Sequence, residues 1–319
     1  MYVLVTGGAG FIGSHLCKKL LVASRMHVIA VDNFDPFYAE QRKRQNLRDL
    51  QQYARFHFHS IDVRSPKAMK KLFEMFPITH VVHLAGRGGV PQSLKYPFLY
   101  IDENVRGTLS VLEAAKKRLS GHFINASSSS VYGEIGTDVC SEGNRTDLPS
   151  SVYAASKKAT ELLCRSYSSM YVMSVINVRF FSVYGPRGRP DQVIYRLTRM
   201  IDTGKTIPWV IPEPQRDFTY IDDVTDGLAK LLRVNGRQAV DINLGYGKPQ
   251  TIGTVIREIE KSLGKRAMIG KTVHRESYDL SASHADTSLA RKAIGWEPRV
   301  DLSLGISRFV KWYQMNEPN

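Results

Sequence analysis

The chain has 319 residues, of which 43% are hydrophobic and 23% charged, so it is long enough for about two domains with large apolar cores. This composition excludes a disordered, collagen-like or fibrous protein. The formal charge of +14, from 44 basic and 30 acidic residues, favours a polyanionic partner such as nucleic acid, an anionic membrane surface or a phosphorylated substrate.

Short β-branched runs alternate with stretches of helical period along the first 180 residues. This alternation is typical of βαβ units and predicts a doubly wound parallel sheet. The predicted strands are Tyr2 to Thr6, His27 to Asp32, Arg55 to Asp62, His80 to Ala85, His122 to Ser127 and Ser174 to Phe180. The predicted crossover helices lie around Ile12 to Val22, Pro66 to Met75, Asn104 to Arg118 and Tyr153 to Met170, and Glu40 to Leu50 is expected to be a solvated basic helix face.

After Phe181 the regular alternation ends, because glycine and proline interrupt a stretch with one clear helix, Gln192 to Asp202. The sequence therefore predicts a Rossmann-type domain over residues 1–180 and a smaller α+β, substrate-binding domain over residues 181–319. A helix at Asp222 to Leu232 and a strand at Val240 to Leu244 are expected to return residues 217–245 to the first sheet.

Three glycines follow the first predicted strand and open the next helix, in the pattern G-x-x-G-x-x-G. Gly7 permits a tight turn, Gly10 allows the backbone to approach a pyrophosphate, and Gly13 allows close packing of helix on strand. The N-terminus of that helix, with Phe11 and Ile12, offers N–H groups and a partial positive charge to phosphates. This context predicts a dinucleotide cofactor.

The next predicted strand ends in Asp32, where a carboxylate accepts hydrogen bonds from the adenosine ribose and repels a 2′-phosphate. The sequence therefore predicts NAD rather than NADP, although Lys43 and Arg44 lie downstream and would favour a phosphate. Asp62 is a candidate adenine contact or, alternatively, a strand-end cap. The other cofactor candidates lie after the predicted strands or at the start of the next helix: Asn33, Val63, Leu84, Ala85, Gly86 and Asn104, the last of which is alternatively a polar residue inside its helix.

Tyr153 and Lys157 stand four residues apart at the start of a predicted helix, so both side chains lie on one face. They follow the fifth strand, whose end carries Ser128, Ser129 and Ser130. The carboxyl ends of the strands are where a doubly wound fold places its chemistry. This position favours a catalytic group over the alternatives, a surface pair on the helix and a polar turn.

Seven segments carry a resemblance to a known family: TGGAGFIGSHL, HLAG, SSSSVYG, YAASK, RFFSVYGPRGRPD, RDFTYIDDV and NLGYGKP. In order and spacing they resemble extended short-chain dehydrogenases/reductases of the nucleotide-sugar epimerase group, from Met1 to about Tyr313. Within that group, VDNFDPFY, GPRGRPD and RDFTYIDD are most similar to UDP-glucuronate 4-epimerases.

The resemblance implies an NAD-dependent isomerase that inverts C4 of a UDP-sugar through a 4-keto intermediate, most of all converting UDP-glucuronate to UDP-galacturonate. Tyr153 would be the acid/base, Lys157 would favour its phenolate and hold the nicotinamide ribose, and Ser128 would orient the 4-hydroxyl. Relatives that dehydrate their substrate carry Asp or Glu directly after the catalytic hydroxyl residue. Here that position is Ser129, which favours simple epimerisation.

The resemblance also implies a set of substrate-binding residues. Arg216 would clamp the diphosphate with a bidentate guanidinium, and Arg275 would be a second clamp. Arg189 would lie near the sugar or its carboxylate, with Arg187 as the alternative. Further candidates are Ser129, Ser130 and Ser182.

Two segments depart from the pattern of UDP-glucuronate 4-epimerases. Where they read approximately HLAAQAGVRYS, this chain reads HLAGRGGVPQS, so Pro91 replaces an arginine and Arg87 would substitute from four residues earlier. A late P-G-D motif is replaced by HRESYDLSASHAD. UDP-glucose and UDP-N-acetylglucosamine therefore remain alternative substrates.

An alternative of another class is a non-catalytic NAD- or RNA-binding protein of the same fold. The intact Tyr153, Lys157 and Ser128 disfavour it, and so does the lack of a basic stripe interleaved with aromatic residues. Nucleic acid is therefore not an expected partner.

Three widely spaced cysteines, Cys17, Cys140 and Cys164, suggest neither disulfides nor a zinc site, and no metal is expected. No apolar run approaches the roughly 18 to 20 residues of a membrane helix, and the start of the chain has no basic segment before its apolar stretch. We therefore expect a cytoplasmic enzyme without a membrane partner. By resemblance we expect a homodimer formed through the helices around Asn104 and Tyr153.

Overall fold

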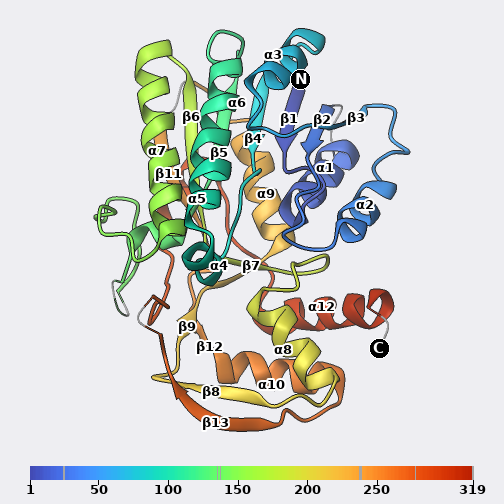
Figure 1. The fold of residues 1–319 in the computed structure, drawn as a ribbon, viewed down its shortest axis with the longest axis vertical. Helices are drawn as coiled ribbons and strands as arrows, with labels where there is room; N and C mark the ends of the chain where they lie inside the picture. The colour runs from blue at the N-terminus through green and yellow to red at the C-terminus, as the bar shows by residue number, and fades with distance from the viewer. Residues whose placement is uncertain (24–25, 135, 137, 237–238, 277, 318–319) are drawn as a thin grey trace. The chain divides into compact units, whose positions relative to one another are not determined.

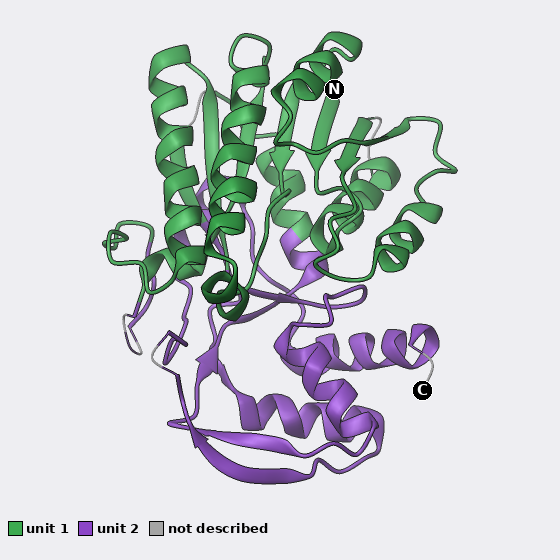
Figure 2. Ribbon diagram, viewed as in Figure 1, with its two compact units in different colours: residues 1–133, 142–180, 225–242 green, residues 134–141, 181–224, 243–319 purple. Residues whose placement is uncertain are grey.

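A computed structural model of the chain describes residues 1–319 except 24–25, 135, 137, 237–238, 277 and 318–319. The chain forms two compact units, each assembled from segments that are separate in the sequence (Figure 2). Unit 1 comprises residues 1–133, 142–180 and 225–242, and unit 2 comprises residues 134–141, 181–224 and 243–319. Each unit therefore depends on contacts between distant parts of the chain.

Unit 1 is built on a seven-stranded sheet with strand order β11-β6-β5-β4-β1-β2-β3. The pairings from β3 across to β6 are parallel. The winding direction reverses between β1 and β4, and folds of this kind bind ligands outside the carboxyl ends of the strands at such a point. The strands are β1 (Tyr2–Thr6), β2 (His27–Asp32), β3 (Phe56–Ser60), β4 (His80–His83), β5 (His122–Ser128), β6 (Ser174–Phe180) and β11 (Ala239–Leu244).

Helices cover both faces of this sheet (Figure 1). On one face α6 packs between α3 and α7. On the other face lie α1 and α9, which are joined by an ion pair between Lys19 and Asp226 at 3.1 Å. The helices are α1 (Phe11–Ala23), α2 (Glu40–Arg48), α3 (Pro66–Met75), α4 (Val90–Lys95), α5 (Pro97–Tyr100), the π-helix η1 (Ile101–Arg106), α6 (Gly107–Ala115), the 3₁₀ helix η2 (Ser129–Tyr132), α7 (Val152–Tyr171) and α9 (Ile221–Leu231).

The central strands are rich in apolar residues because helices bury both of their faces. All seven residues of β5 and all seven of β6 are buried. A core cluster that includes Leu4, Phe123, Val111 and Leu112 packs the sheet against α6 and its neighbours. This core fixes the strand ends that carry the candidate site, and the predicted α/β fold with a doubly wound sheet is confirmed.

Some elements differ from those predicted. The helix predicted from Asn104 begins earlier, as α5, and passes through the π-helical η1 before it becomes α6. Helix α4 was not predicted, because Gly88, Gly89 and Pro91 at its start are typical of loops. π-helical turns are rare and frequent at functional sites, and η1 carries Asn104.

Unit 2 combines helices with three two-stranded sheets, β10–β7, β12–β9 and β13–β8. Trp296 is fully buried and donates its indole N–H to the carbonyl oxygen of Asp223 at 2.8 Å. The helices are α8 (Val193–Asp202), α10 (Ile252–Leu263), α11 (Ser288–Ile294) and α12 (Leu302–Asn316), and the strands are β7 (Ser182–Tyr184), β8 (Ile207–Ile211), β9 (Gln215–Arg216), β10 (Phe218–Tyr220), β12 (Gln250–Thr251) and β13 (Ile269–His274).

Three segments that were predicted to belong to the first domain, residues 134–141, 217–224 and 243–245, lie in unit 2. Residues 134–141 join unit 2 because Cys140 N–H donates to the carbonyl of His284 at 2.7 Å and Asn243 donates to the carbonyl of Cys140 at 2.8 Å. Residues 217–224 also lie in unit 2, so the return to the sheet begins at Thr225.

The cysteines Cys17, Cys140 and Cys164 are all buried and form no disulfide. Burial raises the pKa of the Cys17 and Cys164 thiols, which makes both unreactive. In the described part of the chain, no group of three or more His, Cys, Asp or Glu side chains is placed to hold a metal ion. Among the same residues, every helix is too short or too polar to cross a bilayer.

Candidate active site

The glycine loop after β1 forms a tight cradle. Gly7 has a φ of +65°, which favours glycine, and its carbonyl accepts a hydrogen bond from Gly10 N–H at 3.0 Å. A Cβ on Gly13 would lie 2.1 Å from the carbonyl oxygen of Gly7, so only glycine fits there. α1 begins at Phe11 directly behind this turn, and its first N–H groups are available to an anion.

Asp32 closes the next strand and organises the loops around the cradle. Its carboxylate accepts hydrogen bonds from Ala9 N–H at 3.2 Å and from Phe34 N–H at 2.9 Å. The side chain is buried, and Lys43 Nζ lies 3.8 Å from it. Burial raises the pKa of the Asp32 carboxyl, whereas Lys43 and the two N–H donors oppose that rise. Asp32 is therefore a positioned acceptor at the place expected for the ribose.

The structure gives Lys43 and Arg44 partners within the protein. Lys43 is buried and donates to the carbonyl of Asp35 at 2.8 Å. Arg44 forms an ion pair with Glu40 at 2.5 Å and lies over the ring of Phe34 at 4.5 Å. Neither is presented as an isolated cation for a 2′-phosphate, which agrees with NAD as the cofactor.

Asp62 and Asn33 follow the ends of neighbouring strands and contact each other. Asn33 Nδ2 donates to Asp62 at 3.3 Å, and Arg64 binds the same carboxylate through Nε at 3.0 Å and Nη2 at 2.6 Å. The bonds from Arg64 lower the pKa of Asp62. Val63 is buried against Gly107. An adenine contact by Asp62 stays a prediction, because its oxygens already have partners.

A hydrogen-bond chain crosses the switch point between β1 and β4. Thr108 Oγ1 donates to the carbonyl of Asn104 at 2.6 Å, so it accepts from His83 Nε2 at 3.1 Å. This assigns His83 Nδ1 as the acceptor of the Thr6 hydroxyl at 2.8 Å. Burial, with a contribution from Lys157, lowers the pKa of His83 to about 3. His83 is therefore neutral and serves as a structural bridge.

The backbone after β4 is anchored to the same chain of hydrogen bonds, at Thr6. The N–H groups of Leu84 and Ala85 both donate to Thr6 Oγ1 at 3.1 Å. Gly86 has a φ of +151°, and a Cβ there would lie 2.7 Å from Asn104 Oδ1 and 3.5 Å from Lys157 Nζ. Glycine is needed at this position because of its positive φ and because a Cβ would clash with Asn104 Oδ1.

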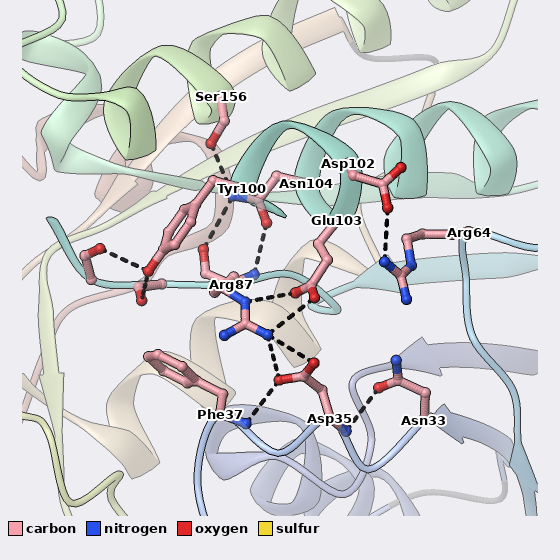
Figure 3. Close-up of polar contacts among 12 residues, drawn as sticks. Asn33, Asp35, Phe37, Arg64, Arg87, Tyr100, Asp102, Glu103, Asn104 and Ser156 are labelled. Carbon is pink, nitrogen blue, oxygen red and sulfur yellow. Dashed lines mark hydrogen bonds and ion pairs between the residues drawn. The ribbon is translucent and has the colours of Figure 1, made fainter. Parts of the chain in front are cut away.

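Asn104 connects this loop to α7, the helix that carries Tyr153 and Lys157 (Figure 3). Its Oδ1 accepts from Arg87 N–H at 2.7 Å, and its Nδ2 donates to the carbonyl of Arg87 at 3.1 Å and to Ser156 Oγ at 2.9 Å. Ser156 directly precedes Lys157 in α7. Asn104 therefore positions the site from inside the protein, and direct contact with the cofactor stays a prediction.

Tyr153 and Lys157 lie in the first turns of α7, which Ser151 caps by accepting Ala154 N–H at 3.1 Å. Lys157 Nζ is buried and donates to the carbonyl of Ala126 at 2.9 Å. Burial lowers the pKa of Lys157 to about 8. The half-buried Tyr153 packs edge-on against Tyr100. The helix thus presents a phenol and an ammonium one turn apart at the end of β5.

Ser128 is the last residue of β5 and is buried. Its hydroxyl accepts Ser130 N–H and donates to Ser130 Oγ, both at 3.2 Å, and thereby caps η2. Ser128 and Lys157 are tied to one strand, since Ala126 lies two residues before Ser128. The structure therefore brings together the three residues predicted to be catalytic.

A buried charged network behind these residues was missed in the sequence analysis. Arg179, which is 1% exposed, binds both carboxylate oxygens of Glu161 at 2.9 and 3.0 Å and Asp241 at 2.6 Å. Glu161 also accepts from Ser127 Oγ at 2.6 Å. Glu161 lies one helical turn after Lys157, so the network fixes α7 against the ends of β5 and β6. Lys158, three residues before Glu161, pairs with it at 3.1 Å, and this i, i+3 spacing of opposite charges is the local sequence signal for the network.

In the structure Arg87 has charged partners that were not predicted from the sequence. Its guanidinium binds the carboxylates of Asp35 and Glu103, with four hydrogen bonds of 2.7 to 3.1 Å (Figure 3). Two carboxylates already compensate its single charge. Arg87 is therefore poorly suited to the predicted role of binding the substrate carboxylate.

Unit 2 brings together the two arginines predicted to clamp the diphosphate. Arg216 Nη2 binds Asp279 Oδ1 at 2.5 Å, and Arg275 donates to the carbonyl of the same residue. Arg275 also lies 3.4 Å from Glu134, which accepts Ser281 N–H at 2.9 Å. The two guanidinium groups therefore converge on one acidic residue within a single unit.

The other predicted substrate residues of unit 2 lie in and after β7. Ser182 begins β7, and its N–H donates to the carbonyl of Asp217 at 2.9 Å. Arg187 has a φ of +64° and Arg189 binds Asp191 at 2.9 Å through both Nε and Nη2. Their roles toward a substrate stay predictions.

Comparison with protein families identifies the class of the chain. Residues 3–245 match the NAD dependent epimerase/dehydratase family. The chain is 38% identical over 317 residues to UDP-glucuronate 4-epimerase of Thermodesulfobacterium geofontis, which covers 99% of this chain and 97% of that protein. It is also 38% identical to UDP-glucuronate 4-epimerase 6 of Arabidopsis thaliana, over 98% of this chain and 71% of the plant protein.

Solved structures give the same result. The UDP-glucuronic acid 4-epimerase of Bacillus cereus, in complex with UDP-glucuronic acid and NAD, superposes with a TM-score of 0.92 and 34% identity over 99% of both chains. The UDP-glucose 4-epimerase of Thermus thermophilus with NAD superposes with a TM-score of 0.89 and 28% identity over 99% of this chain and all of that one.

The chain therefore belongs to the NAD dependent epimerase/dehydratase family. The predicted family, the Rossmann fold and the dependence on NAD are confirmed. The residues of unit 1 fit this cofactor, because the glycine cradle has no room for side chains, Asp32 is a buried acceptor beside it, and Gly86 approaches Lys157.

Proposed function

We propose that this chain is a UDP-glucuronate 4-epimerase, which interconverts UDP-glucuronate and UDP-galacturonate by inverting C4 of the sugar. The observation that carries the proposal is the buried ammonium of Lys157, one helical turn from Tyr153 and bonded to the strand that ends in Ser128. The sugar is chosen because the relatives at 38% identity are named as enzymes for UDP-glucuronate.

Tyr153 takes the proton of the C4 hydroxyl, since the nearby Lys157 cation favours the phenolate. Ser128 hydrogen-bonds the C4 oxygen and orients it toward Tyr153. When bound, NAD supplies the reversible hydride transfer at C4. Tyr153 returns the proton to the C4 oxygen after the keto sugar has presented its other face, so C4 is inverted without net oxidation.

The residues after Ser128 favour epimerisation over elimination of water. Ser129 and Ser130 follow it in η2, so the position that carries a carboxylate in dehydrating relatives has a neutral hydroxyl. Without that carboxylate, elimination at C5 and C6 lacks a proton shuttle. Ser129 and Ser130 serve instead as hydrogen-bonding partners of the sugar.

Unit 2 supplies the residues for the charged parts of the substrate. We assign the diphosphate to Arg216 and Arg275, because both guanidinium groups already converge on Asp279. Arg189, with Arg187 as the alternative, is assigned to the sugar carboxylate, and Ser182 to the sugar hydroxyls. UDP-glucose and UDP-N-acetylglucosamine are the competing substrates, because they share the diphosphate and the C4 hydroxyl.

The enzyme is proposed to act as a homodimer through the helices near Asn104 and Tyr153. Large apolar side chains are exposed on neighbouring helices of unit 1: Phe98 on α5 (88% exposed), Leu109 on α6 (38%) and Leu162 on α7 (54%). Figure 1 shows α5 and α6 following each other in one column beside α7. A second copy would bury them. Light scattering should give twice the chain mass, and Leu162→Glu should give the mass of one chain.

The compartment is proposed to be the reducing cytoplasm. All three cysteines are buried thiols that form no disulfide, as expected where thiols stay reduced.

The test is an assay of the purified protein with NAD against UDP-glucuronate, UDP-glucose and UDP-N-acetylglucosamine, with chromatographic separation of the C4 epimers. We expect UDP-galacturonate without net NADH. Tyr153→Phe should retain NAD and lose at least about 10²-fold in turnover, because only the proton-transferring hydroxyl is removed. Turnover of a neutral sugar alone would contradict the substrate. Failure to convert any sugar, with NAD still bound, would favour a binding protein.

A further inference from the structure

Arg87 links the loop after β2 to the π-helical η1 (Figure 3). Its Nη2 binds both carboxylate oxygens of Asp35, in the loop after β2, at 2.7 and 2.8 Å. Its Nε and Nη2 bind Glu103, in η1, at 3.0 and 3.1 Å. The Arg87 side chain is only 9% exposed, and those of Glu103 and Asp35 are 12% and 22% exposed.

The sheet order places this bridge over the end of β1. Strand β1 lies between β4 and β2, Arg87 follows β4, and Asp35 follows β2. The loop that leaves the end of β1 is the glycine cradle, where the family binds the pyrophosphate of NAD. The Arg87–Asp35 bridge therefore spans the carboxyl edge of the sheet at the cradle.

Both ends of the bridge are built into the protein. Asn104 holds the N–H and the carbonyl of Arg87, at 2.7 and 3.1 Å, and is itself bonded to Ser156 beside Lys157. Tyr100 holds the next two carbonyl groups in the same loop, those of Gly88 and Gly89, at 2.8 and 2.9 Å.

The Asp35 end is anchored in the same way. Its carboxylate accepts Phe37 N–H at 2.9 Å, and its own N–H donates to Asn33 Oδ1 at 3.1 Å. The guanidinium of Arg87 also lies over the ring of Phe37 at 5.1 Å. The bridge thus connects the loop next to the ribose-binding Asp32 with the loop next to Lys157.

The charge of the cluster argues against a role in binding an anion. One guanidinium faces two carboxylates, so the cluster is net negative and offers no attraction to a phosphate or to the substrate carboxylate. The contacts instead link the β2 loop, the β4 loop and η1. Such a link resists the opening of the loops.

We propose that Arg87, with Asp35 and Glu103, forms a clasp across the glycine cradle that slows the release of bound NAD. This inference rests on the proposed function only through the NAD site, and it is independent of which sugar is the substrate. NAD that stays bound between turnovers suits an enzyme that regenerates its cofactor in each cycle, and Arg87 would act as a positioning residue.

The test measures the rate at which the purified, NAD-loaded protein releases its cofactor. Released NAD is captured by excess alcohol dehydrogenase and ethanol, and NADH absorbance is followed over time. We expect Arg87→Gln, which keeps hydrogen-bonding groups but removes the charge, to release NAD at least about tenfold faster, because loss of the buried ion pairs lets the two loops open more often. Arg87→Lys should give an intermediate rate.

The matched control is Arg106→Gln. Arg106 also lies in η1 and forms an ion pair, with Asp102 at 3.1 Å, but its side chain is 65% exposed. Its substitution should leave NAD release unchanged. Glu103→Gln, which keeps the Arg87–Asp35 contact, should accelerate release less than Arg87→Gln does and provides a folded variant if Arg87→Gln is unstable.

The outcomes separate the clasp from the proposed function. If Arg87→Gln releases NAD faster and the NAD-loaded wild-type protein does not convert UDP-glucuronate, the result supports the clasp and contradicts the proposed substrate. Release at the wild-type rate from folded Arg87→Gln and Glu103→Gln, judged by circular dichroism, would overturn the clasp even if the enzyme epimerises UDP-glucuronate.

Discussion

Lys157 Nζ donates a hydrogen bond to the carbonyl oxygen of Ala126 at 2.9 Å. This bond fixes the ammonium on α7 to β5, the strand that ends two residues later in Ser128, the proposed substrate-orienting serine. The carbonyl partially compensates a cation that has lost its water, yet burial still lowers the pKa of Lys157 to about 8. The ammonium is therefore charged at neutral pH but close to its titration.

The first prediction concerns the pH dependence of turnover. Above a pH of about 8, Lys157 loses its proton and no longer favours the phenolate of Tyr153, so kcat should decline as the pH rises further. The measurement is kcat for UDP-glucuronate at saturating substrate across neutral and alkaline pH. Lys157→Met should be much slower at every pH and should lack this decline. A wild-type profile that stays flat well above pH 8 would contradict the role of Lys157.

The same shift predicts how pH changes the stability of the NAD-free protein. In the unfolded chain a lysine keeps its proton up to about 10.5, whereas Lys157 in the folded protein loses it near 8. Between these values the unfolded state binds more protons, so the contribution of Lys157 to the free energy of unfolding rises with pH. The difference in urea midpoint between wild type and Lys157→Met should therefore shift in favour of wild type from about pH 7 to about pH 9.5. If the difference in urea midpoint between the two proteins does not change with pH, the lowered pKa of Lys157 is contradicted.

Ser128 offers a prediction that separates chemistry from structure. Ser128→Ala removes the hydroxyl that orients the C4 oxygen, so kcat should fall by about 10- to 100-fold while NAD remains bound. The hydroxyl also caps η2 through Ser130 N–H at 3.2 Å, so a small loss of thermal stability is expected. Ser128→Thr restores the hydroxyl and should recover most of the turnover. Equal kcat for Ser128→Ala and wild type would show that Ser128 does not act on the substrate.

The parts of the fold and site that follow from local spacing were predictable from the sequence. The glycines of the cradle, Asp32 at a strand end, and Tyr153 and Lys157 on one helical face are each defined by distances of a few residues along the chain. Parallel strands then bring such positions to one edge of the sheet. The fold class was predictable for this reason, and the structure places the candidate cofactor residues of unit 1 at or just after the strand ends.

The parts that depend on distant partners were not predictable in this way. Arg87 and Asp35 are 52 residues apart in the sequence. The residues next to Arg87 in the sequence do not indicate which charged side chains surround it in the fold. Residues 134–141 join unit 2 through backbone bonds to the segment near His284, which leave no periodic pattern. The prediction also placed the start of a helix at Asn104, where the structure has a π-helical turn. Local helix propensity does not distinguish a π-helical turn from an α-helical one.

The buried network of Arg179 predicts a large effect on stability. Arg179→Met removes the buried cation that bridges Glu161 and Asp241 and leaves them only the more exposed Lys158 and Arg165. This loss should lower the free energy of unfolding by about 3 kcal/mol. The control is Arg165→Met, because Arg165 binds the same Asp241 at 2.6 Å but its side chain is 48% exposed. That change should cost about 1 kcal/mol or less. Urea unfolding measures the free energy of unfolding of both variants. Equal losses for Arg179→Met and Arg165→Met would contradict the claim that burial makes the Arg179 ion pairs important.

Asp279 binds the guanidinium of Arg216, which we assign to the diphosphate of the substrate. Its carboxylate binds Arg216 at 2.5 Å, so UDP must displace it. Asp279→Asn removes the competing charge and should lower the Kd for UDP about two- to fivefold, since the Asp279 side chain is 45% exposed and its ion pair is correspondingly weak. Titration calorimetry with UDP provides the measurement.

A second variant shows whether such a gain is specific to the diphosphate. Asp191→Asn removes the partner of Arg189, which we assign to the sugar carboxylate. It should leave the Kd for UDP unchanged and lower the Kd for UDP-glucuronate alone. If Asp279→Asn instead weakens UDP binding, Asp279 serves to hold Arg216 in place, and the diphosphate approaches Arg216 from the side that Asp279 leaves open.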